Sequence, residues 1–458
     1  MKPFTGFAKS IPLDDSWEVI VVGGGPAGCA AAAAAAREGA RTLLIEGAGA
    51  LGGMGTSGLV PAWCPFSDKE KLIYRGMGQR VMETLKSQMP HVKPDMVDWV
   101  PIDAEKLKVV YDDLVTGYGV SVLFHTMLSA VETDGDGRVT GIIVTNKSGL
   151  TAFRAKVYVD CTGDADLAAW AGGEYGKGDA EGSLQPATHC FILGNVDEYA
   201  YLNGPNLHNQ NKQSPIYEIA QSGDYPLIPD AHLCNNLVAP RATGFNAGHI
   251  WEVDHTDPWN TSQAMIRGRA MAQQYRDALA KHHPRAFANA YVASTGALMG
   301  IRETRRILGD YVLTLEDYLN RQSFPDEICR NNYYIDIHFT AEEAKALLEG
   351  KLVEKQRSFR YGPGESHGVP YGCLTPKGLA NVLVAGRSIS CERAVQGSVR
   401  VMPVCLATGE AAGLAAAMAA AAPASDVHAV DVSELRSRLK EAGAYLPDQS
   451  HSLEGQPL

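Results

Sequence analysis

The chain has 458 residues, of which 45% are hydrophobic and 20% are charged. This composition excludes a disordered or fibrous chain, and the length is sufficient for a large domain with a second domain inserted into it. The formal net charge of −11 disfavours nucleic acid as the main partner, because phosphate binding needs a basic face and no Lys/Arg run supplies one. We therefore expect a small-molecule ligand.

The cysteine pattern and the apolar segments predict a cytoplasmic protein. The nine cysteines include no C-x-x-C pair, which argues against a redox pair or a zinc knuckle and fits a reducing compartment. The first residues lack the apolar stretch of a secretory signal. The most apolar helical stretch, 411–422, ends before Pro423 and is shorter than the roughly 20 residues that a bilayer requires. No membrane span is expected.

The first predicted unit along the chain is strand, helix, strand. Residues 17–22 are typical of a buried parallel strand, residues 26–38 of a helix that ends at Gly39, and residues 41–45 of a second strand. Seven consecutive alanines on the helix indicate close packing against a sheet, because alanine is small and has the highest helix propensity.

The rest of the chain first extends this unit and later returns to it. A helix is expected over 103–116, followed by short alternating runs that we interpret as an antiparallel meander, at 120–124, 128–133, 139–145 and 150–154. Residues 156–166 are another buried strand that leads into a glycine turn. From 171 to 370 the pattern changes, and a strand at 381–390, a small-residue helix at 403–422 and a short helix at 432–443 then resume the nucleotide-binding pattern.

The turn after the first strand carries a dinucleotide-binding fingerprint. Gly23, Gly25 and Gly28 form G-x-G-x-x-G at the point where strand becomes helix, which permits a tight bend and close approach of a diphosphate to the helix N-terminus. Pro26 at the start of the helix costs no hydrogen bond. Glu46, at the end of the second strand, is placed to accept a hydrogen bond from a ribose hydroxyl. This motif alone does not choose between NAD and FAD.

Four further motifs resemble a known family. "LGGMGTSGLV" (51–60) is similar to the segment along the flavin in glutathione-reductase-type proteins, and "VDCTGDADLA" (159–168) to a later turn near the ADP moiety. "NVLVAGRSISCERAVQGSVRVMPVCLATGEAAGLAAA" (381–417) resembles the closing motif, and "GIRETRRILGDY" (300–311) a central one. The chain thus resembles the FAD-dependent oxidoreductases related to the fumarate reductase and succinate dehydrogenase flavoproteins, from residue 17 to about residue 446.

The resemblance implies noncovalently bound FAD and an α/β fold. It implies a Rossmann-type FAD-binding domain, with a parallel sheet, helices and the small antiparallel meander, interrupted by an α+β substrate domain. The expected bounds are 17–170 and 371–446 for the FAD-binding domain and 171–370 for the substrate domain. The residues expected to contact FAD are Gly23, Gly25, Pro26, Ala27, Gly28, Glu46, Gly52, Gly53, Met54, Thr56, Val131, Thr162, Gly163, Asp164, Gly386, Arg387, Ser398 and Arg400.

Arginines of the central motif are the first catalytic candidates. Helical spacing would place Arg302 beside Arg305 and Arg306 on one face, where carboxylates or an anionic ligand must offset their repulsion. Spacing alone favours a solvated or paired helix face, and the family resemblance adds a site role for Arg302 or Arg305.

Histidine and tyrosine supply the candidates for proton transfer. His367 and Tyr371 precede the last flavin strand and are expected to reach over the ring as acid or base. In "HIWEVDH" (249–255), a strand would put His249 and His255 about 20 Å apart, too far to bind one ion, so no metal site is expected there. His249 is instead a candidate for lining the substrate pocket.

The combined expectation is an FAD-dependent dehydrogenase that moves hydride between a small polar substrate, an alcohol, sugar or acid, and flavin N5. Two alternatives stay open: fumarate-reductase-like reduction of an activated double bond with Arg302 as proton donor, and a flavoprotein that carries FAD for a partner without turnover. An NAD-only dehydrogenase is disfavoured by the second glycine cluster and the closing motif. The sequence does not indicate the electron acceptor or the oligomeric state.

Overall fold

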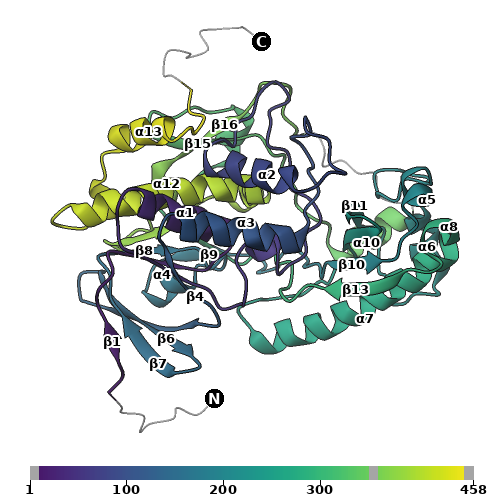
Figure 1. Ribbon diagram of the computed structural model, residues 1–458, viewed down its shortest axis with the longest axis horizontal. Helices are drawn as coiled ribbons and strands as arrows, with labels where there is room; N and C mark the ends of the chain where they lie inside the picture. The colour runs from purple at the N-terminus through teal and green to yellow at the C-terminus, as the bar shows by residue number, and fades with distance from the viewer. Residues whose placement is uncertain (1–9, 350–358, 448–458) are drawn as a thin grey trace.

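The computed structural model describes residues 10–349 and 359–447 (Figure 1). Its central feature is a five-stranded parallel sheet with the order β17-β8-β2-β3-β4. The strands are β2 (Val19–Val22), β3 (Thr42–Ile45), β4 (Ser121–Leu123), β8 (Val157–Asp160) and β17 (Val382–Val384). Every residue of β2, β3, β8 and β17 is buried, as expected for apolar strands covered on both faces. The α/β fold with a Rossmann-type parallel sheet is thereby confirmed.

Four helices cover one face of the parallel sheet. They are α1 (Pro26–Arg37), α2 (Met77–Ser87), α3 (Ala104–Gly117) and α12 (Met402–Ala421), and Figure 1 shows α1 between α12 and α3. The alanines of α1 allow α12 to approach very closely: a Cβ placed on Gly413 would lie 2.0 Å from the carbonyl oxygen of Ala31. Two segments far apart in the sequence therefore form one tightly packed layer.

The antiparallel meander lies on the opposite face of the sheet. It consists of β5 (Met127–Thr133), β6 (Val139–Asn146) and β7 (Gly149–Phe153), and β1 (Leu13–Asp14) adds to β7 in parallel. The prediction that residues 120–124 belong to the meander was wrong, because this run forms β4 and pairs in parallel with β3. Helix α3 is the crossover that returns the chain to the edge of the parallel sheet.

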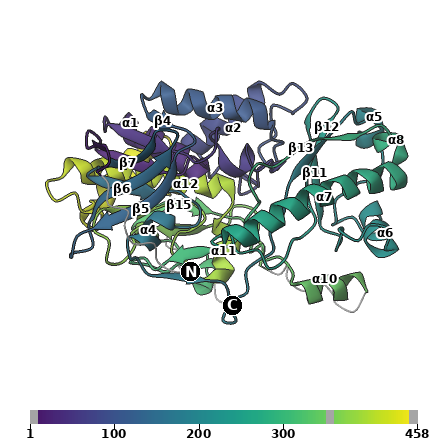
Figure 2. The ribbon, with the colours of Figure 1, turned by 90° about the horizontal axis from the view of Figure 1, so that it is seen from below.

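A second body with its own hydrophobic core extends to one side (Figure 2). Its antiparallel sheet has the order β11-β12-β10-β13 and packs against the long helix α7 (Pro258–His282). The strands are β10 (Phe191–Gly194), β11 (Leu233–Ala239), β12 (Ala242–Ala247) and β13 (Tyr291–Thr295), and the shorter helices are α5 (Glu198–Leu202), α6 (Pro215–Ser222), α8 (Pro284–Phe287) and α10 (Ala341–Leu348). This body falls within the predicted substrate domain, whose bounds stay a prediction.

The remaining elements are short. They are the strands β9 (Tyr175–Lys177), β14 (Arg305–Ile307), β15 (Glu327–Asn331) and β16 (His367–Pro370), the helices α4 (Asp166–Trp170), α9 (Leu315–Leu319), α11 (Arg393–Val399) and α13 (Val432–Glu441), and the 3-10 turns η1 (Gly53–Gly55), η3 (Tyr371–Cys373) and η4 (Val427–Ala429). The central motif (300–311) was predicted to be helical, and this prediction was wrong. Arg305 and Arg306 lie in β14, which pairs with β9, so their side chains point to opposite faces of a strand.

Within the described residues, one helix has the length and apolarity to cross a bilayer. This helix is α12, and 83% of its apolar window is buried inside the fold, as in the core helix of a soluble protein.

Candidate active site

The first glycine turn leaves open space in front of helix α1. A Cβ on Gly23, where φ is +97°, would lie 2.4 Å from the carbonyl oxygen of Cys161, and one on Gly28 would lie 1.7 Å from that of Gly23. These two glycines are required by backbone packing. A Cβ on Gly25 would meet nothing within 4 Å. Because Gly25 is the N-cap of α1 and no side chain caps the helix, the first-turn amides, including that of Ala27, face this space.

The second glycine cluster packs directly on the first turn. The amide of Gly52 donates to the carbonyl oxygen of Gly24 over 2.8 Å, and a Cβ on Gly53 would lie 3.0 Å from the Cα of Gly25. Thr56 is fully buried, and its hydroxyl donates to the carbonyl oxygen of Leu51 over 2.5 Å. The predicted cofactor residues of both clusters therefore meet at one place.

Glu46 has a different partner from the ribose hydroxyl expected of it. Its carboxylate accepts hydrogen bonds from the backbone amides of Gly24 and Ala48, each over 2.6 Å. The carboxylate thus holds the glycine turn against the end of β3. A contact with ribose stays a prediction.

Asp164 connects the later turns of the parallel sheet. Its carboxylate accepts from Nη2 of Arg387 over 2.6 Å and from the hydroxyl of Thr304 over 2.5 Å, and it contacts His255. Burial opposes the ionisation of Asp164, but Arg387 and His255 outweigh it and hold the pKa of this carboxyl well below its usual range. Nε of Arg387 also donates to the carbonyl oxygen of Gly163 over 2.8 Å. The predicted contacts at Thr162, Gly163, Asp164, Gly386 and Arg387 therefore form one connected group.

A cavity of about 710 Å³ lies between the two bodies. Six residues of its wall belong to the flavin motifs at 51–60 and 381–417: Met54, Val60, Arg387, Arg400, Val401 and Met402. Val401 is the N-cap of α12, and no side chain caps this helix, so a second helix N-terminus opens beside the cavity. The opposite wall is built from the antiparallel-sheet body.

Two arginines bring positive charge to the cavity wall. Arg302 is 6% exposed, and its Nη1 donates to the carbonyl oxygen of Pro186 and the hydroxyl of Thr188. Burial and the nearby Arg400 lower the pKa of Arg302 to about 10. Nη2 of Arg400 donates to Asp336, while its Nε is buried and has no partner among the described residues. These guanidinium groups retain donors for an anionic ligand.

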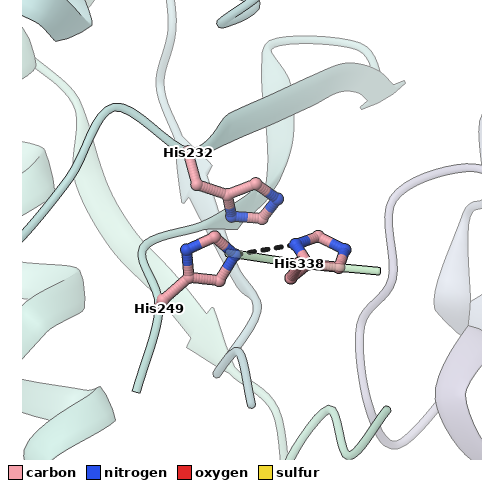
Figure 3. A group of neighbouring side chains, drawn as sticks. All are labelled: His232, His249 and His338. Atoms are coloured by element: carbon pink, nitrogen blue, oxygen red, sulfur yellow. Dashed lines mark hydrogen bonds between the residues drawn. The ribbon is translucent and has the colours of Figure 1, made fainter. Parts of the chain in front are cut away.

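Three histidines converge on the same wall (Figure 3). Nε2 of His249 lies 2.8 Å from Nδ1 of His338, and the ring of His232 stacks on that of His249 with centroids 4.2 Å apart. Asp230 contacts Nδ1 of His249, and Asp336 lies 3.4 Å from Nε2 of His338. Burial and Arg302 lower the pKa of His338 to about 3, and burial lowers that of His232 well below its usual range.

The sequence model of the FAD dependent oxidoreductase family matches residues 18–439. The chain belongs to this family. It is therefore an FAD-dependent oxidoreductase, which confirms the predicted cofactor and enzyme class. No curated protein matches the sequence.

Solved structures resemble this FAD-dependent oxidoreductase at low identity. A geranylgeranyl bacteriochlorophyll reductase-like protein from Thermoplasma acidophilum is 13% identical, with a TM-score of 0.45 over 94% of this chain and 83% of that one. OxyS anhydrotetracycline hydroxylase from Streptomyces rimosus is 12% identical, with a TM-score of 0.45 over 93% and 65%. A flavin-dependent brominase triple mutant is 12% identical, with a TM-score of 0.47 over 93% and 84%. The family assignment rests on the sequence match.

The residues present fit FAD. The open space at Gly25 and the uncapped start of α1 suit the diphosphate, and the uncapped start of α12 at the cavity suits the electron-rich end of a flavin ring. Two further contacts, those of Val131 and Ser398, stay predictions. Val131 is in β5 of the meander, and the hydroxyl of Ser398 is occupied by the carbonyl oxygen of Tyr333 and by Asn331. Neither of these two residues lines the cavity.

The structure does not bring the other catalytic candidates to the cavity. His367 is fully buried between Tyr361 and Asn331, and burial, with Arg330 and Arg321, lowers its pKa to about 3. The hydroxyl of Tyr371 donates to the carbonyl oxygen of Val427 over 2.8 Å. Arg305 pairs with Asp166 over 2.7 Å. These polar groups are bound by other groups of the protein, and the reach of His367 and Tyr371 over the flavin and the site role of Arg305 stay predictions.

Residues 249–255 do not form the strand considered above. Only Ile250 makes an isolated bridge, and Glu252 adopts a positive φ of +61°. His255 turns to Asp164, whereas His249 meets His232 and His338. Neither the contact of His255 with Asp164 nor the contacts of His249 with His232 and His338 were predicted from the sequence. The available signal was a repeated D-x-H pattern, Asp230 to His232 and Asp336 to His338.

Proposed function

We propose that this oxidoreductase transfers hydride between a C–H bond of a small polar substrate and flavin N5, and that the substrate is an acid rather than a neutral alcohol or sugar. The observation that carries the proposal is the position of Arg302 and Arg400 on the wall that also holds Met54 and Met402 of the flavin motifs. Bound FAD supplies the two-electron acceptor. All other roles fall to side chains of the chain itself.

The arginines bind and orient the substrate. Both hydrogen bonds of Arg302 within the described residues use Nη1, which leaves Nε and Nη2 for a carboxylate. A planar guanidinium suits two parallel hydrogen bonds to a carboxylate, and it orients the substrate as it binds. The carboxylate of Asp336 accepts a hydrogen bond from Nη2 of Arg400 and fixes the position of its guanidinium group. The imidazoles of His232, His249 and His338 form the polar surface that faces the rest of the substrate.

The proposal is tested with a panel of hydroxy acids, sugars and alcohols mixed anaerobically with the oxidised enzyme. Loss of oxidised-flavin absorbance with an acid is the expected result. In Arg302→Met, KM for that acid should rise about 10- to 100-fold at unchanged FAD content, because a hydrogen bond to a charged group contributes about 1.5–3 kcal/mol. Arg276→Met, on the outer surface of α7 beside Asp277, is the matched control. Equal reduction by acids and neutral compounds, or the same KM in Arg302→Met, would contradict the proposal.

A second candidate function is reduction of an activated double bond with Arg302 as the proton donor. The lowered pKa of Arg302 favours it, because a guanidinium that releases its proton more readily is a better acid. An α,β-unsaturated acid should then reoxidise the photoreduced enzyme, and Arg302→Lys should slow this reaction while substrate binding persists. If unsaturated acids leave the reduced enzyme unchanged, hydride removal from a saturated substrate is the better assignment.

We infer a cytoplasmic location for this enzyme. The nine cysteines form no disulfide among the described residues, and seven of them are buried. Many cysteines without disulfides are typical of a reducing compartment.

A further inference from the structure

The three histidines at the cavity wall come from segments far apart in the chain. His232 precedes β11, His249 follows β12, and His338 precedes α10. Their ring centroids are 4.2, 4.9 and 5.1 Å apart, and one nitrogen of each ring lies within 4.8 Å of the others. Figure 3 shows the three rings close together, with the contact between His249 and His338 drawn as a dashed line. All three residues line the cavity.

Carboxylates determine which imidazole nitrogens carry protons. The carboxylate of Asp230 contacts Nδ1 of His249 and accepts from the backbone amide of His232 over 3.0 Å, so one acid orients the ring of His249 and holds the backbone at His232. Asp336 lies beside Nε2 of His338. Protons therefore belong on Nδ1 of His249 and on Nε2 of His338, where each faces a carboxylate.

This placement of the protons leaves an unshared electron pair on each of the two facing nitrogens of His249 and His338. Nε2 of His249 and Nδ1 of His338 then face each other across 2.8 Å with lone pairs on both atoms. Nδ1 of His232 is shielded from solvent and has no hydrogen-bond partner within the described residues. If His338 carried its proton on Nδ1 instead, that proton would join the two rings, but Nε2 would then face the carboxylate of Asp336 without a proton. A cation between the rings satisfies every nitrogen at once.

We propose that His232, His249 and His338 bind one divalent transition metal ion of the Zn²⁺ class. Imidazole nitrogens suit this class, and a carboxylate on the outer nitrogen of a ligand histidine is the usual support for such a site. With bonds of about 2.0–2.1 Å, tetrahedral ligand nitrogens are about 3.3 Å apart, so His249 and His338 need to separate by about 0.5 Å. The ring of His232, which is stacked on that of His249, must also rotate to direct a nitrogen at the ion. Asp230 and Asp336 offset the charges of Arg302 and Arg400 near the ion.

Three protein ligands leave an open coordination position. Sites of this composition hold water or a substrate oxygen there, whereas structural zinc sites are closed by a fourth protein ligand. Because the three histidines line the cavity, the open position faces the substrate space. The inference rests on the proposed function for its substrate: the ion would hold an oxygen of the acid beside the arginines.

The test is calorimetric titration of the tag-free, FAD-loaded enzyme with zinc sulfate after treatment with a chelator. One Zn²⁺ per chain is expected, with binding at least 100-fold weaker in His338→Ala and in His232→Ala. Asp230→Asn should weaken binding about 10- to 100-fold through His249. His428→Ala is the matched control, because this residue pairs with Asp310 away from the cavity. FAD content and circular dichroism verify that each variant is folded.

Absence of stoichiometric binding, or equal binding by His338→Ala and the wild-type enzyme, would overturn the metal site. Should one histidine variant fail to fold, the other and Asp230→Asn decide by the same criterion. Reduction of the flavin by an acid is measured separately, on the zinc-free and on the zinc-loaded enzyme. If an acid reduces the flavin but the enzyme binds no zinc, the metal inference fails and the proposed function stands. If zinc binds but no acid reduces the flavin, the proposed function fails and the metal site stands.

Discussion

Replacing Gly413 with alanine is expected to force apart the two helices that begin at the cofactor. The new Cβ would lie 2.0 Å from the carbonyl oxygen of Ala31 in α1, whereas ordinary contact begins at 3.4 Å. One helix must therefore move by about 1.4 Å. Overpacking costs about 1–3 kcal/mol, and a backbone neighbour that cannot rotate away places this case near 3. The better helix propensity of alanine offsets at most about 1 kcal/mol, so the expected loss is about 2 kcal/mol.

The matched control is Gly117→Ala at the end of α3. A Cβ on Gly117 meets nothing within 4 Å, so alanine contributes its helix propensity there without a clash. Thermal unfolding followed by circular dichroism should show Gly413→Ala melting roughly 2 °C below the wild type, because an unfolding entropy of about 2.1 cal/mol/K per residue gives about 1 °C per kcal/mol for 458 residues. Gly117→Ala should melt at or slightly above the wild type. Equal melting temperatures and equal FAD content in the two variants would refute the reasoning.

Three other outcomes are expected. Gly25→Ala should fold normally, because its φ of −68° suits alanine, yet lose FAD affinity at least tenfold as its methyl group enters the diphosphate space; full FAD occupancy would contradict this. Burial raises the pKa of Asp160 to about 6, above 3.8 in the unfolded chain, so its contribution to stability is present below pH 4 and lost as the pH rises towards 6. The free energy of unfolding of the wild type relative to Asp160→Asn should thus fall by roughly 2–3 kcal/mol between pH 4 and pH 7, and parallel pH profiles would argue against it. An alkylating reagent should modify at most Cys64 and Cys234 in the folded enzyme, because the other thiols are buried, and all nine in denaturant.

Local sequence patterns were sufficient for the parallel sheet. Strands and helices that are buried on both sides need apolar or small residues throughout, and a short stretch of sequence is enough to show this. The apolar runs of β2, β3 and β8 and the alanines of α1 are examples. Residues 120–124 were assigned to the wrong sheet, because their alternation describes a strand but not its partner. Pairing with β3 is decided by the crossover through α3. Arg305 and Arg306 likewise became a strand because β9 offers hydrogen bonds that helical spacing cannot reveal.

Some parts of the candidate site could likewise be predicted from the sequence and others could not. The glycine turns and the family resemblance were readable from contiguous segments, and the FAD assignment is confirmed. The histidine cluster could not be predicted from contiguous segments. His232, His249 and His338 are far apart in the sequence and come together only in the folded chain. His367 illustrates the converse. Its position before the last strand suggested a reactive group, yet Tyr361 and Asn331 bury and saturate it.

The contact between α1 and α12 has a consequence for biosynthesis. Helix α1 ends at Arg37 and α12 begins at Met402, so the surface that covers the alanines of α1 is translated about 365 residues later. At 5–20 residues per second, that apolar stripe waits for roughly 20–70 s. Nascent chains stalled before α12 should therefore need chaperone protection, and a cell would gain little from FAD supplied before translation ends.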